Sequence, residues 1–568
     1  MKVYVGRGKS LISGYGGGFE ETVGAMWRGV SALREKAWVN GKKLWVQSID
    51  GEINGDGNLS RLEKMGVKVM RECIEDNGWK KEVGRRVGVV LSTTKGNIRE
   101  AGESAPEKGN RVMIYKMARR IVGAVGLDVE PVVVCNACIS GVAAVIVGSR
   151  MIRRGVYDEV FVVGMDESSQ FVTSGFMGFR SVSERKCVPY DSRRDGLSLG
   201  EAAGCLMLSN RAIEGAEMTI EGGALNNDAN HISGPSRTGE PLGMSIEKAL
   251  GESKRTVNSV AFVNAHGTGT VYNDEMEAKA ICLARLDSVR VNSLKPYLGH
   301  TLGASGLIEL MVCGEELKRG EVLGTLGFKE LGVSKPLKVS GKRELVEGEC
   351  CVKTASGFGG CNAAVVMSKV SNAREIGENY DWDFKMVRSV DIKDGKILVD
   401  GVDIVDDGRK RVFADLVREG YHRLGDINMK FFKMDDLCKM GYIGAEYLLK
   451  GLDINEGDRR SMAILMANRS GSLDTDIEYI KQMRENRTSP GTFVYTLPNI
   501  VIGEICIRHG IRGESLFIIE PERDDKKIRE QAKQMLNLDE SGRLICGWCE
   551  KLCGEYELHL ELLDIKRP

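Results

Sequence analysis

The chain has 568 residues, and its 80 lysines and arginines balance 80 aspartates and glutamates, so the formal net charge is zero. This balance argues against a nucleic-acid binder that relies on an overall basic field, and the length predicts more than one folding unit. Hydrophobic residues make up 42% and charged residues 28%, which is typical of globular proteins and excludes a disordered or collagen-like chain.

The N-terminal sequence does not resemble a secretion signal, because it lacks an apolar stretch of 7–15 residues and a cleavage site. The most apolar run covers residues 131–148, which is short for a membrane span and contains Asn136 and Ser140. A buried strand that leads into a buried helix explains this run better. The 15 cysteines are scattered without a disulfide-like spacing, so we expect reduced thiols in a cytoplasmic protein without a membrane span.

Taken in chain order, short β-rich runs alternate with amphipathic segments. The predicted strands are KVYVG (2–6), VGVVLST (87–93), VVVCNA (132–137), EVFVVGM (159–165), GCLMLSN (204–210), SVAFVNAHG (259–267) and NAAVVMSKV (362–370). The predicted helices include RVMIYKMARRIVGAVG (111–126) and DEMEAKAICLARL (274–286). This alternation predicts an α/β architecture with helices packed on sheets.

The pattern changes near residue 370, where a polar stretch without periodicity begins, so we place a domain boundary at about 370–385. Beyond it the chain repeats part of the first region. LEKMGVKVM (62–70) resembles LCKMGYIGA (437–445) at an offset of 375, and AVGLDVEPVVVCNAC (124–138) resembles RHGIRGESLFIIEPE (508–522) at an offset of 384. Gly96 matches Gly471 at 375, and VFVVGMDE (160–167) matches RLICGWCE (543–550) at 383. Such matches in one order predict a duplicated βαβ unit.

Three segments carry candidate chemistry. In VVVCNACISG (132–141), Cys138 lies where a β-branched strand meets a small-residue helix start, and the helix end there favours thiolate and a lowered pKa. The alternative is a buried, inert cysteine. In VNAHGTGTVYNDEMEA (263–278), His266 ends a strand before glycines and threonines that leave room for a ligand. In NSLKPYLGHTLGASGLIELM (292–311), His300 follows a glycine, with Lys295 upstream and Glu309 downstream.

A cysteine and two histidines suit nucleophilic catalysis in which neutral imidazoles donate to an oxygen that gains negative charge, as in an enolate. A Cys/His hydrolase would instead need one histidine beside the thiol and a third group to orient it.

These segments resemble those of the β-ketoacyl synthases, the condensing enzymes of fatty-acid and polyketide synthesis. NACISG resembles the nucleophile motif, NAHGTGT the first histidine motif, and the run from Lys295 to Glu309 the motif of the lysine and second histidine. PYDSRRDGLSLGEAAG (189–204), DANHISGP (228–235) and SGFGGCN (356–362) resemble further family segments in the same order. The resemblance implies a thiolase-like layered αβαβα fold for residues 1–370, and a second, partial thiolase-like α/β module for residues 385–568.

The resemblance also implies roles for individual residues. Cys138 would take an acyl group from a carrier-protein thioester, and His266 and His300 would assist decarboxylation of a malonyl thioester. Lys295 would lie near His300 and pair with Glu309. The substrate-binding residues implied are Phe358, Gly359, Thr268 and Thr270, with the backbone N–H groups of Cys138 and Phe358 as the oxyanion hole, Phe358 as the gate of the acyl pocket and the threonines on the phosphopantetheine arm.

The same resemblance implies no cofactor beyond the phosphopantetheine arm of the acyl carrier protein, and no metal. The expected partners are that carrier protein and a second subunit, in a homodimer or a ketosynthase-like heterodimer, with no nucleic acid. Two departures concern acyl-chain preference: Ser356 and Cys361 replace a common aromatic residue and threonine, and Tyr272-Asn273-Asp274 replaces a more usual Gly-Asp pair.

The second copy lacks the chemistry, because Cys138 falls on Glu522 at the offset of 384 and no HGTGT or GH segment follows. We expect residues 385–568 to pack against a ketosynthase surface, as nucleophile-free chain-length factors do. Cys546 and Cys549, followed by Cys553, form a CxxC pattern that a redox or metal site would also show, but the repeat places it on a strand.

Two further interpretations of the whole chain remain at this point: a non-catalytic chain-length-factor-like partner or scaffold, and a thioesterase-like hydrolase. The intact set Cys138, His266, Lys295, His300 and Glu309 favours the catalytic interpretation.

Overall fold

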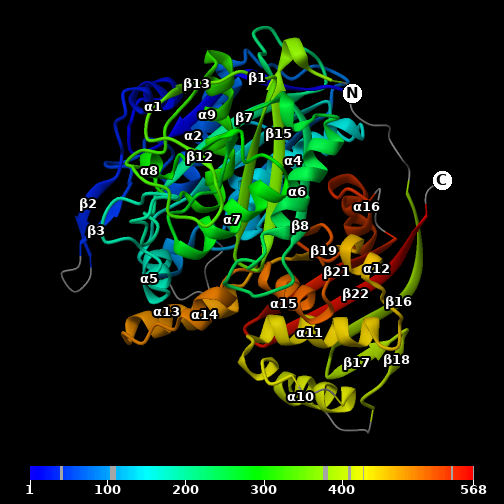
Figure 1. Ribbon diagram of the computed structural model, residues 1–568. Helices are drawn as coiled ribbons and strands as arrows, with labels where there is room; N and C mark the ends of the chain where they lie inside the picture. Colours follow the sequence, from blue (N-terminus) through cyan, green and yellow to red (C-terminus); the bar gives the residue numbers. More distant parts are fainter. Residues whose placement is uncertain are drawn as a thin grey trace.

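The computed structural model describes residues 1–38, 43–102, 111–374, 382–406, 411–425, 428–538 and 542–566 (Figure 1). Within these ranges, no helix combines the length and apolar character needed to cross a bilayer.

The first module contains two half-sheets, and all seven strands predicted from the sequence are present in them. The first has the strand order β5-β4-β6-β7-β1, made of β1 (Val3–Ile12), β4 (Val87–Ser92), β5 (Val132–Val134), β6 (Glu159–Asp166) and β7 (Ala202–Ser209). The second has the order β8-β15-β14-β9-β10, made of β8 (Met218–Asn227), β9 (Val260–Asn264), β10 (Arg290–Asn292), β14 (Cys350–Gly357) and β15 (Cys361–Lys369). β1 pairs with β8 and joins the two.

Helices form three layers around these half-sheets. α4 (Ser140–Arg153) and α9 (Ser305–Arg319) pack on each other between them, and α4 is buried along almost its whole length. A helix with neighbours on every side needs apolar residues all round, which explains the long apolar run of residues 131–148. α2 (Arg61–Asp76) and α3 (Ile114–Ala124) cover one outer face, and α6 (Glu240–Glu252) and α7 (Val271–Leu283) cover the other. The expected αβαβα arrangement is confirmed.

The second module repeats only the first half of this arrangement. Its strands follow the order β16-β22-β21-β19-β20, made of β16 (Asp383–Lys393), β19 (Ala463–Asn468), β20 (Ser515–Ile519), β21 (Arg543–Leu552) and β22 (Glu555–Lys566). α11 (Asp436–Leu449) and α15 (Ile500–His509) pack together, and α11 lies on this sheet. The predicted boundary at 370–385 includes residues 375–381, which lie outside the described residues.

The strand registers establish the repeat more sharply than the sequence does. Val90 pairs with Val132 and Val162 in the first module, and Leu465 pairs with Leu516 and Cys546 in the second. Val90 of β4 therefore corresponds to Leu465 of β19 at an offset of 375. Val132 of β5 and Val162 of β6 correspond to Leu516 of β20 and Cys546 of β21, each at an offset of 384. The sequence-based offset of 383 for the third strand is therefore wrong by one residue, and the counterpart of Glu550 is Asp166 rather than Glu167. Both carboxylates accept backbone N–H groups from the loop that follows the first strand.

The helix after β20 is buried on fewer sides than α4, its counterpart in the first module. α16 (Asp525–Met535) occupies the place that α4 has in the first module, packing on β19 and β21. No second half-sheet covers it in the described part of the chain, and its sequence DKKIREQAKQM buries only one side. Glu522, the counterpart of Cys138, is exposed.

The two modules are joined through β5 and β20, which pair antiparallel. The pairing continues toward Cys138, where the Cys135 N–H donates to the Phe517 carbonyl at 3.0 Å and the Phe517 N–H donates to Asn136 Oδ1 at 3.0 Å. Residues beyond 385 therefore pack on the first module of their own chain, as the sequence led us to expect of a ketosynthase surface. In Figure 1, α13 (Leu473–Arg484) and α14 (Pro490–Tyr495), in orange, reach under α5 (Gln170–Gly178), which they contact.

Two buried ion pairs cross the same boundary. Arg150 binds Glu514 with both terminal nitrogens, at 2.7 and 2.8 Å, and Lys95 Nζ lies 2.5 Å from Asp476 Oδ1. Phe493 of α14 lies in an aromatic cluster with Phe176 and Phe179. Buried charges without partners cost several kcal/mol, so these pairs hold the modules in one register.

The CxxC pattern lies on β21, as the repeat indicated. Cys546 and Cys549 are three positions apart on a strand, so their side chains leave opposite faces. Both are buried and free. A disulfide between them would require the strand to break.

Candidate active site

Cys138 lies at the sharp turn that follows β5. Ala137 has a φ of 48°, which starts a single turn of 3₁₀ helix over Ala137–Ile139 and then α4. Ser140 fastens the turn, because its Oγ accepts the Asn136 N–H at 2.8 Å and donates to the Ala137 carbonyl at 2.7 Å. The thiol thereby lies at the N-terminal end of a helix that is buried along almost its whole length.

The ionisation of this thiol differs from the sequence-based expectation. Burial raises the pKa of Cys138 to about 12, and the positive charge of Lys295 opposes this rise only in part. The helix end does not lower the pKa below its ordinary value, because the thiol is only 8% exposed and thiolate loses its hydration there. At neutral pH the raised pKa keeps the resting residue a neutral thiol.

The two histidines reach Cys138 from the other half-sheet. His266 follows β9, and His300 follows the short helix α8 (Lys295–Leu298). Their ring centroids lie 5.0 Å apart with the rings nearly perpendicular, at 84°. One ligand-type atom from each of Cys138, His266 and His300 lies within 4.8 Å of the others. All three side chains, predicted from separate motifs, share one buried site.

A charged cluster lies behind the histidines. Glu309 of α9 receives Lys295 Nζ on one oxygen and Lys353 Nζ on the other, each at 2.6 Å, and all three residues are buried. The expected Lys295–Glu309 pair is thus present, whereas Lys353 was not identified from the sequence. Burial would raise the pKa of Glu309, but the two lysines outweigh it and hold the pKa at about 2.

This cluster keeps a positive charge next to the imidazoles. The pKa values of His266 and His300 lie well below 6.5, first because burial disfavours the charged ring and then because Lys295 and Lys353 repel it. Both rings are neutral at physiological pH, so each carries one N–H donor and one bare nitrogen. Nδ1 of His300 has no hydrogen-bond partner among the described residues.

Two buried carboxylates of α7 hold the loop that carries His266. Glu277 accepts the N–H groups of His266 and Gly267 at 2.7 and 2.6 Å. Asp274 accepts the N–H groups of Thr268 and Gly269, and burial raises its pKa to about 7. The hydroxyls of Thr268 and Thr270 lie 2.9 Å apart, with Thr268 the more buried. The spacing of these acids from His266 was a usable signal, since carboxylates eight and eleven residues later, on the helix that follows, can accept the N–H groups of the loop.

Phe358 and Gly359 lie on the turn between β14 and β15, close to Cys138. A Cβ atom on Gly357 would lie 3.0 Å from the Cys138 backbone nitrogen, so this turn touches the start of α4. The Phe358 ring stacks near Phe176 and tilts against Phe179, at centroid distances of 5.8 and 5.5 Å. Phe176 of α5 and Phe179, which directly follows it, therefore pack against the side chain that is predicted to gate the acyl pocket.

The cysteine and two histidines are also close enough to hold a metal ion. Zinc would need a thiolate and further ligands. The raised pKa of Cys138 and the two lysines beside the rings both act against a dication. The donor set therefore fits acyl chemistry better than metal binding.

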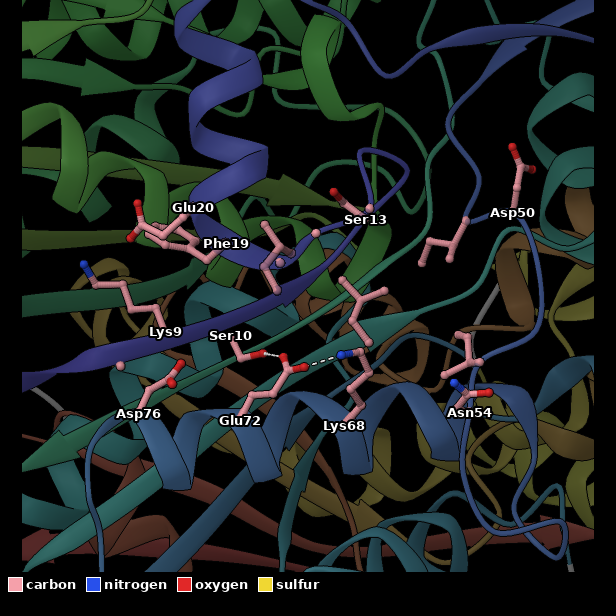
Figure 2. A pocket seen from close by; sticks show the side chains of 18 of the residues that line it. Lys9, Ser10, Ser13, Phe19, Glu20, Asp50, Asn54, Lys68, Glu72 and Asp76 are labelled. Carbon is pink, nitrogen blue, oxygen red and sulfur yellow. Dashed lines mark hydrogen bonds and ion pairs between the residues drawn. The ribbon is translucent and has the colours of Figure 1, made fainter.

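A separate cavity of about 940 Å³ opens on another part of the first module, lined by β1, α2 and the glycine-rich segment before α1 (Gly18–Trp27) (Figure 2). Three of its polar side chains contact one another, since Glu72 binds both Ser10 and Lys68. No residue of the cysteine–histidine site lines this cavity, and it contributes nothing to the chemistry described here.

Comparison with known proteins identifies the family of the first module. Residues 37–212 match the family described as beta-ketoacyl synthase, N-terminal domain, and residues 218–329 match beta-ketoacyl synthase, C-terminal domain. The chain is 26% identical over 351 residues to the tetracenomycin polyketide synthase ketoacyl synthase alpha subunit of Streptomyces glaucescens, covering 55% of this chain and 82% of that one. It is 29% identical over 339 residues to 3-oxoacyl-acyl-carrier-protein synthase 2 of Vibrio cholerae, covering 54% and 81%.

A solved structure described as PfaC keto synthase–chain length factor extends the likeness in fold to both modules. It aligns with a TM-score of 0.79 at 16% identity and covers 99% of this chain and 78% of its own. The two family matches together span more than half of the chain and include His266 and His300, with Cys138 in the N-terminal match. The protein belongs to the β-ketoacyl synthase family, whose members named above are acyltransferase-type condensing enzymes.

Proposed function

We propose that this protein is a β-ketoacyl-acyl-carrier-protein synthase that works through an acyl-Cys138 intermediate. Its substrates are an acyl thioester and a malonyl thioester, both on the phosphopantetheine arm of an acyl carrier protein. The observation that carries the proposal is the convergence of Cys138 with two neutral imidazoles in one buried site. Relatives named as 3-oxoacyl-acyl-carrier-protein synthases support the same reaction class.

The first half-reaction is thioester exchange. Cys138 Sγ attacks the acyl carbonyl, the bond to the carrier sulfur breaks, and the proton of Cys138 ends on the released phosphopantetheine thiol. The oxyanion that forms is stabilised by the backbone N–H groups of Cys138 and Phe358. One such donor contributes a factor of about 10²–10³ in acyl-transfer enzymes.

The second half-reaction is decarboxylative condensation. A malonyl thioester loses CO₂, and the remaining electron pair forms an enolate whose oxygen receives N–H donors from His266 and His300. The enolate carbon attacks the acyl-Cys138 carbonyl, the C–S bond breaks, and the Cys138 sulfur takes up one proton from solvent. Neutral rings suit this step, because each has an N–H to donate.

The charged cluster supports the second step. Lys295, Lys353 and Glu309 together carry one net positive charge, which favours the developing enolate and keeps both rings neutral. Thr268 and Thr270 lie on the loop that carries His266, and in this proposal they bind the amides of the phosphopantetheine arm.

Product analysis tests the proposal and separates it from the alternatives. Purified protein is mixed with an acyl-carrier thioester and malonyl-carrier thioester, and the carrier is analysed by mass spectrometry. The proposal predicts a carrier-bound β-ketoacyl product that requires both substrates. Free acid as the main product would indicate a hydrolase, and no reaction with any acyl length would favour the scaffold interpretation.

A further inference from the structure

The turn that carries Phe358 forms hydrogen bonds with residues of both modules. We call residues 356–362 the Phe358 loop. On the side of the first module, Asn227 Nδ2 donates to the Gly359 carbonyl at 2.8 Å, and the Gly359 N–H donates to the Ile232 carbonyl at 2.6 Å. On the other side the loop meets Asn499 and Gly503 of the second module.

Asn499 reaches across the module boundary rather than serving its own helix. It precedes α15, at the position where an asparagine side chain usually accepts an N–H of the first turn. It makes no such cap, and its Nδ2 instead donates to the Phe358 carbonyl at 2.8 Å. Because a carbonyl oxygen can only accept, the amide nitrogen must face it. Asn499 is 3% exposed, and its Oδ1 is buried without a hydrogen-bond partner among the described residues.

The backbones touch at this point as well. A Cβ atom on Gly359 would lie 2.6 Å from Asn499 Nδ2, and a Cβ atom on Gly503 would lie 2.8 Å from the Gly359 oxygen. Real Cβ atoms do not come this close to backbone atoms, so position 503 requires glycine. At position 359 the nearest atom belongs to a side chain, and the φ of 88° is what favours glycine. The start of α15 and the Phe358 loop are therefore in direct contact.

The repeat gives an independent argument. At the offset of 384, the counterpart of Asn499 in the first module is Tyr115, which packs beside Lys116 and Arg119. Among the described residues, a loop of the Phe358 type occurs only in the first module. The second module, which faces the Phe358 loop across the boundary, thus has an asparagine at this position. The first module, which faces no such loop among the described residues, has a tyrosine.

We propose that Asn499 is a positioning residue of the active site: by holding the Phe358 carbonyl, it fixes the peptide unit next to the Phe358 N–H. This inference rests on the proposed function, which assigns that N–H to the oxyanion hole. The nucleophile-free module thus completes the catalytic site of its neighbour. Asn499 itself touches neither substrate nor Cys138.

The test compares two reactions of the same thiol in the full-length protein. Acyl transfer from an acyl-carrier thioester builds an oxyanion, whereas alkylation of Cys138 by iodoacetamide displaces iodide and builds none. For Asn499→Ala and for Asn499→Asp, which keeps the size but loses the donor, we expect single-turnover acylation to slow about tenfold. The alkylation rate should stay within about twofold of the wild type.

Two further variants sharpen the test. Tyr479→Phe removes a different contact across the boundary, the one between the Tyr479 and Ser174 hydroxyls at 3.1 Å, and should leave both rates unchanged. Gly503→Ala pushes on the Phe358 loop without touching the asparagine, and should slow acylation selectively, as Asn499→Ala does.

The outcomes are distinguishable. If acylation by Asn499→Ala matches the wild type, or if both rates fall by the same factor, the positioning role is overturned while the proposed function stands. If the wild type is alkylated at Cys138 but never acylated by carrier thioesters, the proposed function fails, and the inference fails with it.

Discussion

Val134, the last residue of the strand before the nucleophile, lies directly opposite Ile518, which is its own counterpart in the repeat. An antiparallel pair in which a residue meets its equivalent places a local two-fold axis between the two strands. The chain thus builds within itself the self-complementary strand pairing that two identical subunits would make. Only one side of this axis keeps the chemistry, because Cys138 faces two histidines and Glu522 is exposed.

The histidines should separate the two half-reactions. His266→Ala and His300→Ala each remove a donor to the enolate, so we expect condensation to fall about a hundredfold or more. Acylation of Cys138 should persist within about tenfold, since that step uses backbone donors. Parallel assays of decarboxylated malonyl thioester and of acyl-enzyme would measure the two effects. Equal losses in both assays would contradict the division of labour.

The lysine cluster predicts a specific pH dependence. The pKa values of His266 and His300 are lowered by burial first and by Lys295 and Lys353 in addition, so the rings stay neutral as pH falls from 8 to about 6. In Lys353→Met one repulsive charge is gone and Glu309 is paired only with Lys295, so both pKa values rise. In a plot of the rate of malonyl decarboxylation against pH, the loss of rate on the acidic side should therefore begin at a higher pH than in the wild type.

An exposed lysine of the second module supplies the control for this shift. Lys396→Met removes the same charge from the surface of β17 (Lys396–Val399) and should leave the onset of this loss at the wild-type pH. If Lys353→Met and Lys396→Met give the wild-type profile, the cluster does not set the charge state of the rings.

The ion pair between the modules should be essential for stability. Glu514→Ala leaves Arg150 buried without its carboxylate, which typically costs about 3–5 kcal/mol in the free energy of unfolding. The matched control is Glu130→Ala, because Glu130 is the repeat counterpart of Glu514 and forms an exposed pair with Arg119. Chemical denaturation should find a much smaller loss for Glu130→Ala. Similar losses for both variants would contradict the role given to the buried pair.

The fold was largely predictable from the sequence, and the reasons are local. Most of the seven predicted strands are short apolar runs inside a sheet, where burial on both faces leaves a strong pattern. β8 was missed because MTIEGGALNN mixes glycine and polar residues, and β16 because its polar face is solvated. Cys138, His266 and His300 were identified because each lies in a segment that resembles a family motif, with Cys138 where a strand meets a helix start and the two histidines beside glycines.

What the sequence did not indicate depends on long-range contacts. In the sequence Lys353 looks like an ordinary lysine of a strand, and only the folded structure shows that it pairs with Glu309. In the sequence Asn499 looks like an N-terminal helix cap, and only the folded structure shows that its side chain binds the Phe358 loop instead. The direction of the Cys138 pKa was predicted wrongly, because a sequence shows the helix start but not the enclosure that outweighs it.

His559 makes the second module sensitive to alkaline pH. Burial alone would lower the pKa of His559, but hydrogen bonds to Asp391 and Glu561 raise it to about 9. A folded-state pKa above the unfolded value of about 6.5 stabilises the fold fully below pH 6.5, and the contribution is lost as pH rises through 9. Allowing for partial solvent screening, we expect a loss of about 2 kcal/mol. The unfolding midpoint of wild type should fall more steeply between pH 6 and 9.5 than that of His559→Gln, and parallel curves would refute the assignment.

Intact-mass analysis of the protein after mixing with acyl-carrier thioesters tests the central claim most directly. The account predicts that wild-type protein gains the mass of one acyl group, that Cys138→Ala gains none, and that Cys361→Ala, which removes the neighbouring buried thiol, still gains one. Acylation of Cys138→Ala to the same extent as wild type, or of wild type at another cysteine, would contradict the assignment of Cys138 as the nucleophile.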